Sequence, residues 1–150
     1  MRLQEIRPDQ FHYLQGTSYG ELSEESQKRL LMESQAKEHQ GRYFCLLLIW
    51  EEEEVVGAIN LFGHGEKEIS IGPEIKPNYQ GRGFAAQAMG LALDFVAGMG
   101  FTRAASEIRE DNEASLALHK KLGFRVTREY VNKRGRDVVW MEREIQPLVE

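Results

Sequence analysis

The chain has 150 residues, of which 41% are hydrophobic and 29% are charged, and its formal net charge at pH 7 is −5. This length supports one sizeable core but hardly two, so we expect a single domain over residues 1–150. An acidic chain with a pI of about 5.5 is unsuited to wide binding of a nucleic-acid backbone, and no apolar run approaches the ~20 residues that cross a bilayer. Because the first five residues also lack a signal-peptide core, we expect a cytoplasmic protein without nucleic-acid or membrane partners.

Charge is distributed unevenly along the chain. Residues 1–74 carry 7 basic and 14 acidic side chains, whereas residues 75–150 carry 12 and 10. Such an asymmetry is common on solvated surfaces, but it also leaves room for an anionic ligand on the basic part and a cationic one on the acidic part. Cys45 is the only cysteine, which excludes an internal disulfide and suits a reducing compartment.

The first third of the chain predicts a short strand and a helix. Residues 3–7 alternate and stop at Pro8, as a short strand does, and residues 9–14 fit a helical turn. Ser23 is a predicted N-cap for a helix that runs to about Glu38. The apolar face of this helix is narrow, so it is either a mobile wall over a substrate site or a poorly packed surface helix.

An antiparallel meander of three strands is predicted next, over residues 43–50, 55–61 and 68–75. The first of these is apolar throughout, which is typical of a strand covered on both faces, and Cys45 within it is a core filler rather than a nucleophile. Residues 63–65 predict the turn into the third strand. Pro73 cannot donate to a sheet ladder, so it predicts a break in pairing near the end of that strand.

A glycine-rich turn follows the third strand and opens a long apolar helix pattern. Its sequence, residues 80–85, is Gln-Gly-Arg-Gly-Phe-Ala. Two glycines at alternate positions let the backbone approach a ligand, and the first amides of the helix carry the positive end of the helix dipole. The turn is therefore a predicted cradle for an anion, most often a phosphate.

The same turn satisfies the dinucleotide-binding pattern G-x-G-x-x-A over residues 81–86, with Glu107 at a suitable distance to hold a ribose hydroxyl. In a dinucleotide fold, however, the glycines follow the first strand directly and a second mononucleotide half comes later. Here five residues separate Ile75 from Gly81, and too little chain remains for a second half. A P-loop fits even less well, because no Gly-Lys-Ser/Thr follows.

The remaining chain predicts two helices and three strands. A helix over 84–99 leads to a strand over 103–109 that runs parallel to the strand before the helix. Asn112 is a predicted N-cap for a further helix, whose buried stripe is expected to consist of Ala114, Leu116, Ala117, Leu118 and Leu122. Residues 125–131 and 136–144 alternate across a turn and predict a closing hairpin.

Two of these stretches resemble motifs of one family. Residues 80–85 resemble the Q/R-x-x-G-x-G/A signature of the GNAT superfamily, the acyl-CoA-dependent N-acyltransferases. Residues 112–115, Asn-Glu-Ala-Ser, followed by Lys-Leu-Gly-Phe at 121–124, resemble a second motif of that family at the expected distance. The resemblance extends from about residue 55 to residue 144.

The resemblance implies an α+β (mixed α/β) fold. Its mostly antiparallel central sheet would have a bulge near Pro73 and a splay between the fourth and fifth strands, and about four helices would flank it. Pantetheine would lie in the splay, with the pyrophosphate of coenzyme A on the amides of the turn. The residues implied in binding acetyl-CoA are Ile75, Gln80, Gly81, Arg82, Gly83, Phe84, Ala85, Asn112 and Ser115. Helix capping accounts for Asn112 equally well.

The implied chemistry is transfer of acetyl from acetyl-CoA directly to a primary amine. An alkylamine has a pKa of about 10, so its deprotonation at pH 7 calls for a base or a water relay to one. Glu74, beside the expected cleft, is the predicted base, and Glu107 is the second candidate. Where the family often has a tyrosine that protonates the thiolate, this chain has His119, which either donates that proton or only borders the cleft. No cluster has metal-ligand spacing, so we expect no metal.

The acceptor and the class of function stay open. A protein N-terminus, a lysine, a polyamine, an aminoglycoside and an amino acid are all candidates, because the acceptor walls would come from residues 8–42. The acceptor is thus a small-molecule or peptide amine, and a homodimer is compatible with the sequence. A noncatalytic module that senses acyl-CoA for a protein partner would need the same turn but neither a base nor an acid.

Overall fold

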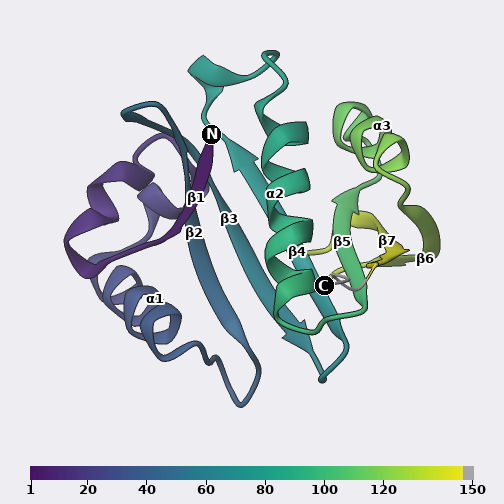
Figure 1. Cartoon of the computed structure of the whole chain (residues 1–150), viewed down its shortest axis with the longest axis horizontal. Helices are drawn as coiled ribbons and strands as arrows, with labels where there is room; N and C mark the ends of the chain where they lie inside the picture. The colour runs from purple at the N-terminus through teal and green to yellow at the C-terminus, as the bar shows by residue number, and fades with distance from the viewer. Residues whose placement is uncertain (147–150) are drawn as a thin grey trace.

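The computed structural model describes residues 1–146, and within them a seven-stranded sheet forms the centre of the molecule (Figure 1). Its strand order is β1-β2-β3-β4-β5-β7-β6. The strands are β1 (Arg2–Glu5), β2 (Phe44–Glu51), β3 (Glu54–His64), β4 (Glu68–Ile75), β5 (Arg103–Arg109), β6 (Arg125–Val131) and β7 (Asp137–Glu144). In this part of the chain β4 and β5 pair in parallel, and every other neighbouring pair is antiparallel. The predicted mixed, mostly antiparallel sheet is confirmed.

Helices cover both faces of the sheet. The α-helices are α1 (Glu24–Ala36), α2 (Phe84–Gly98) and α3 (Glu113–Lys121), and the 3₁₀ helices are η1 (Pro8–Leu14), η2 (Ser18–Glu21) and η3 (Pro77–Tyr79). Ser23 caps α1 as predicted, its hydroxyl accepting from the N–H of Ser26 at 3.2 Å. The helix ends at Ala36, about two residues earlier than predicted, because Lys37 adopts a left-handed conformation with φ of 58°. No helix within residues 1–146 is both long enough and apolar enough to cross a membrane.

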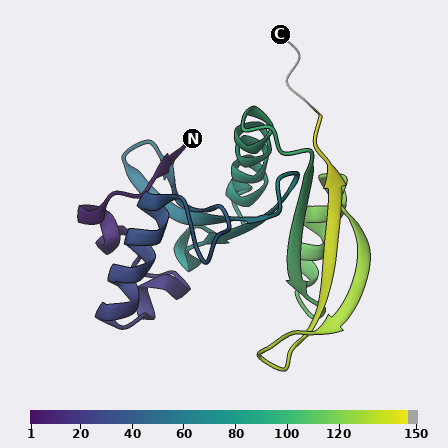
Figure 2. The ribbon, with the colours of Figure 1, turned by 90° about the horizontal axis from the view of Figure 1, so that it is seen from below.

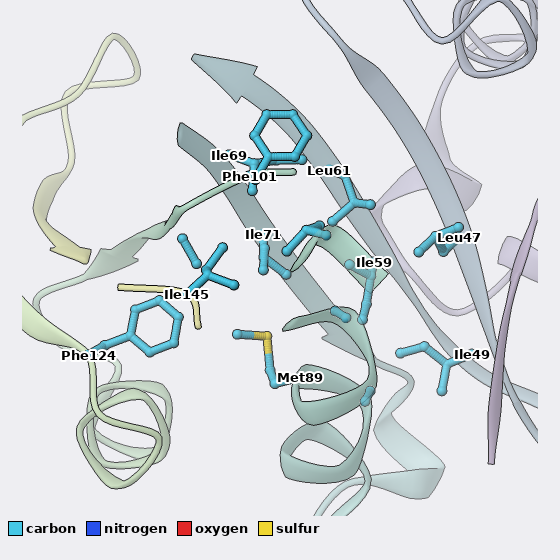
Figure 3. Close-up of a cluster of buried hydrophobic side chains, with 14 of the residues drawn as sticks. Leu47, Ile49, Ile59, Leu61, Ile69, Ile71, Met89, Phe101, Phe124 and Ile145 are labelled. Carbon is cyan, nitrogen blue, oxygen red and sulfur yellow. The ribbon is translucent and has the colours of Figure 1, made fainter. Parts of the chain in front are cut away.

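Alternation along the strands creates one core on each face of the sheet. Leu47, Ile49 and Ile71 point toward α2 and pack with Met89 and Phe124 (Figure 3). The alternate side chains of β2 pack under η1, η2 and α1 on the other face. The prediction that β2 is covered on both faces is thus confirmed.

Cys45 also takes its predicted place. It is 0% exposed and belongs to the core beneath α2. Burial raises the pKa of its thiol.

The two parts of the sheet diverge beyond a short parallel ladder. β4 pairs with β5 only from Glu68 to Ser70, opposite Arg103 to Ala105. Figure 2 shows β1–β4 on one side and β5–β7 standing away from them on the other. The predicted splay between the fourth and fifth strands is confirmed.

The position of the break differs in one respect from the prediction. β4 stays paired with β3 through Pro73, opposite Ile59, up to Ile75, and its register is unbroken. The expected bulge near Pro73 is therefore absent from the β3–β4 ladder. Since Pro73 lies where β4 has already parted from β5, its missing N–H leaves no gap in a ladder on that side.

Two local predictions were wrong. The turn before β4 occupies residues 65–67, because β3 continues through His64, which pairs with Glu68. On α3 the fully buried side chain is His119, whereas Ala114 and Ala117 of the expected stripe are exposed. A polar side chain was not expected on the packed face of a helix, and only its tertiary partners explain it.

Candidate active site

A cavity of about 580 Å³ opens where β4 and β5 part. Eight of the nine predicted cofactor residues line it: Ile75, Gln80, Gly81, Gly83, Phe84, Ala85, Asn112 and Ser115. The predicted base, Glu74, lines it as well. The structure thus brings together two sequence motifs that lie about thirty residues apart along the chain.

The glycine-rich turn has the conformation that an anion cradle requires. Gly81 and Gly83 adopt left-handed conformations, with φ of 77° and 80°, and Gly83 is the N-cap residue of α2. A side chain at either position would be strained. The first N–H groups of any α-helix have no intrahelical acceptor, so those of Phe84, Ala85 and Ala86 are available to a ligand. These residues fit an anionic group such as a diphosphate.

Side-chain contacts tie the turn to the end of β4. The amide of Gln80 donates from Nε2 to the carbonyl of Ile75 at 3.0 Å. Arg82, the ninth predicted cofactor residue, does not line the cavity, and its guanidinium lies 4.8 Å from the centre of the Phe84 ring. The Tyr79 hydroxyl donates to Glu54 at 3.0 Å, and this hydrogen bond raises the pKa of Tyr79.

The second motif forms the opposite wall of the cavity. Asn112 caps α3, its Oδ1 accepting from the N–H of Ser115 at 3.1 Å, and both residues line the cavity. The capping role predicted for Asn112 is confirmed. Sequence reasoning missed five lining residues: Pro73, Tyr79, Ala86, Ala114 and Leu118. Their proximity to the two motifs is the signal that could have found them.

Glu74 is held at the cavity by the segment between β1 and α1. Its Oε1 accepts from the backbone N–H of Ser18 at 2.6 Å, and its Oε2 accepts from the Ser18 hydroxyl at 2.7 Å. The start of η2 therefore fixes the orientation of the carboxylate. Each oxygen keeps a further lone pair, so the group can still accept a hydrogen from a ligand.

His119 does not reach the cavity. Its ring is 1% exposed, with Nε2 at 3.1 Å from the Ser106 hydroxyl and Nδ1 at 2.8 Å from the carbonyl of Ser115. Burial lowers the pKa of His119, so the ring stays neutral at physiological pH. The predicted acid His119 is therefore not placed to protonate a thiolate in the cavity, because its imidazole turns inward to partners on β5 and on its own helix.

A second cavity, of about 430 Å³, lies on the other face of the sheet. Phe62 and Ser70 point into it, whereas their neighbours Leu61 and Ile71 pack toward α2. Further walls are aromatic, from Phe44, His64 and Trp140. No sequence pattern indicated this cavity, because its walls come from five strands that are distant in the chain.

Glu107 is the carboxylate in this second cavity. Its Oε1 accepts from the Tyr130 hydroxyl at 2.8 Å, and its Oε2 from the Asn132 side chain at 3.4 Å. Burial and the contact with Glu107 raise the pKa of Tyr130 to about 12, so Tyr130 remains a hydrogen-bond donor at neutral pH. Glu107 thus faces the aromatic walls from the β5 side of the splay.

No three His, Cys, Asp or Glu side chains gather into a metal-binding group within residues 1–146.

Comparison with known proteins points to one family. The sequence model of the family described as "Acetyltransferase (GNAT) family" matches residues 3–124. A segment of 73 residues is 37% identical to the N-alpha-acetyltransferase RimI of Mycobacterium tuberculosis. That match covers 47% of this chain and 44% of the relative, so it spans less than half of that protein.

Solved structures of low sequence identity share the fold. A spermidine N-acetyltransferase from Vibrio cholerae, in complex with CoA and spermine, superposes with a TM-score of 0.74 at 17% identity, over 97% of this chain and 96% of that one. RimL, a ribosomal L7/L12 alpha-N-protein acetyltransferase in complex with coenzyme A, superposes with a TM-score of 0.78 at 19% identity, over 95% and 93%.

Proposed function

This chain belongs to the GNAT family of acetyltransferases, and from that premise we propose that it transfers acetyl from acetyl-CoA directly to a primary amine. The observation that carries the proposal is the cavity at the β4–β5 splay, where the glycine-rich turn, Asn112 and the Glu74 carboxylate meet. An anion cradle, a slot between strands and a candidate base are the three parts that such a transfer needs.

The cofactor half of the site would be held mainly by backbone. The amides of Phe84, Ala85 and Ala86, together with the left-handed Gly81 and Gly83, suit the pyrophosphate of coenzyme A. Pantetheine would follow the unpaired edge of β4. When bound, acetyl-CoA supplies the activated acetyl group, and an N–H of this edge would stabilise negative charge on its carbonyl oxygen.

The burial of Cys45 supports transfer without an acyl-enzyme intermediate. The thiol is 0% exposed in β2, its pKa is raised, and it does not line the cavity. A thiol that is both inaccessible and protonated is a poor nucleophile. The amine nitrogen would therefore attack the thioester carbon itself, forming the C–N bond as the C–S bond breaks.

Glu74 is the proposed base. It would take the proton of the attacking amine, directly or through a water molecule, at a place fixed by its two hydrogen bonds to Ser18. Glu107 is the alternative, since it borders the splay from β5. Because His119 is buried, we propose solvent in its place as the source of the proton for the departing thiolate.

The cavity on the far face is the proposed entrance for the acceptor. Its aromatic walls and the single carboxylate of Glu107 suit an ammonium group before deprotonation. The two cavities adjoin along β4, one reaching Gly72 and the other beginning at Pro73. The names of similar proteins include both a small polyamine and protein N-termini as acceptors, so a small-molecule or peptide amine is the proposed acceptor class.

Release of free thiol from acetyl-CoA, measured over a panel of amines, tests this function. The panel would contain peptides with free N-termini, lysine, spermidine, an aminoglycoside and free amino acids. Turnover with at least one acceptor, lost in Glu74→Gln or Glu107→Gln, is the expected result. Tight coenzyme A binding without turnover on any acceptor would instead favour the noncatalytic sensing module.

A further inference from the structure

The gap between β4 and β5 begins at a side-chain bridge. Backbone pairing ends at Ser70 opposite Ala105, and the next carbonyl on β4, that of Ile71, accepts a hydrogen bond from the Ser106 hydroxyl at 2.9 Å. Ile71 and Ser106 are 1% and 3% exposed. A buried carbonyl needs a partner. Here a side chain of β5 provides that partner where the backbone ladder has stopped.

The bridge continues into α3 through His119. Its Nε2 lies 3.1 Å from the Ser106 hydroxyl, and its Nδ1 lies 2.8 Å from the carbonyl of Ser115. The ring packs edge-on against Phe124, with 5.0 Å between the ring centres. Since Ser115 lines the splay cavity, a series of three contacts connects β4 to the wall that Asn112 and Ser115 form.

The three contacts share two hydrogens. Both ends of the series are carbonyls, which only accept, so Nδ1 carries the hydrogen that goes to Ser115. A neutral imidazole and one hydroxyl supply two hydrogens for three contacts. Burial keeps His119 neutral. Nε2 therefore carries no hydrogen, and the single Ser106 hydrogen lies between two acceptors, the Ile71 carbonyl at 2.9 Å and Nε2 at 3.1 Å.

We propose that Ser106 and His119 are positioning residues that set the width of the β4–β5 gap and hold the α3 wall at the distance coenzyme A needs. The inference rests on the proposed function only in assuming that this cavity binds coenzyme A. Without the hydroxyl, the Ile71 carbonyl is left unpaired or β5 closes toward β4 until a backbone N–H reaches it. Either response changes the cavity although neither side chain lines it.

Calorimetric titration with coenzyme A tests the proposal without any acceptor. The first variant is Ser106→Ala, and its matched control is Ser34→Ala. Ser34 is 1% exposed and its hydroxyl accepts from the N–H of Leu46 at 2.9 Å, so it loses a similar buried contact far from the splay. We expect the affinity of Ser106→Ala to fall about tenfold, as loss of a buried hydrogen-bond partner does, and that of Ser34→Ala to match the wild type.

Two variants of His119 separate positioning from mere packing. A glutamine amide can occupy the place of Nε2 and donate to Ser106, whereas an asparagine amide occupies the place of Nδ1 and reaches only Ser115. His119→Gln should therefore bind coenzyme A as well as the wild type does, and His119→Asn should bind about as weakly as Ser106→Ala. This pair carries the test on its own if Ser106→Ala does not fold.

Three results would overturn the proposal: wild-type affinity in Ser106→Ala, equal losses in Ser106→Ala and Ser34→Ala, or equal affinity in the two His119 variants. Failure of the wild-type protein itself to bind coenzyme A is a separate result. It would refute the cofactor site of the proposed function, and this inference with it.

Discussion

Ser18 binds both carboxylate oxygens of Glu74, its backbone N–H donating to Oε1 at 2.6 Å and its hydroxyl donating to Oε2 at 2.7 Å. The two residues are 56 positions apart in the chain. The contact fixes the start of η2 to the end of β4, beside the splay cavity. A carboxylate so held has a defined orientation, and its remaining lone pairs can still accept hydrogen bonds from a ligand.

Glu74→Gln tests the base. Glutamine keeps the size of the side chain and one acceptor oxygen, but it cannot take up the proton of the amine. We expect kcat to fall by about 100-fold or more, while coenzyme A affinity stays near the wild-type value. Thiol release measured alongside Glu107→Gln checks this, because loss of rate in Glu107→Gln alone would assign the role to Glu107.

Gly83→Ala tests the predicted anion-binding turn, and Gly90→Ala, at a glycine inside α2, is its control. Gly83 has φ of 80°, so alanine there costs about 1–2 kcal/mol of strain and moves the amides that follow. Gly90 lies inside α2, and an added Cβ there would meet no atom within 4 Å. Gly90→Ala should therefore stabilise the protein by about 0.5–1 kcal/mol. Thermal unfolding should show lower stability for Gly83→Ala, and titration should show lower affinity for coenzyme A. Gly90→Ala should show neither loss.

Stability should decline as the pH falls below neutrality. Burial lowers the pKa of His64 and of His119, so both remain unprotonated in the folded state at a pH where the unfolded chain, with an ordinary histidine pKa near 6.5, already binds protons. The free energy of unfolding therefore decreases as the pH drops through about 6.5. Urea denaturation at pH 7.5 and pH 6 measures the loss.

His119→Gln supplies the control for this pH dependence. Glutamine does not titrate, so the variant should lose less stability than the wild type between the two pH values. An identical loss in both proteins would show that His119 makes no contribution to the pH dependence.

Cys45→Ala tests direct transfer. The change removes one buried sulfur and should cost about 1 kcal/mol of stability, with acetyl transfer retained. The native protein should also resist thiol reagents until it unfolds, because the thiol is 0% exposed. Mass spectrometry after incubation with acetyl-CoA alone should find no acetyl group on Cys45. Stoichiometric acetylation there would contradict transfer without an acyl-enzyme.

Local patterns were enough to place the two motifs. Helix α2 begins at Phe84 and Asn112 caps α3, both as predicted, because helix starts depend on residues within one helical turn. The meander of β2, β3 and β4 followed from apolar segments joined by short links. The splay came from the family resemblance, and the end of the parallel ladder at Ser70 now gives its position.

By itself, the sequence determined the turn, the caps, the order of the elements and the family, all of which depend on neighbours in the chain. Tertiary structure alone decided that Ser18 holds Glu74, that His119 turns inward to Ser106, and that an aromatic cavity opens beside Glu107. The physical reason is distance along the chain: these contacts join segments whose meeting depends on how the strands and helices pack. No local pattern of side chains encodes that packing.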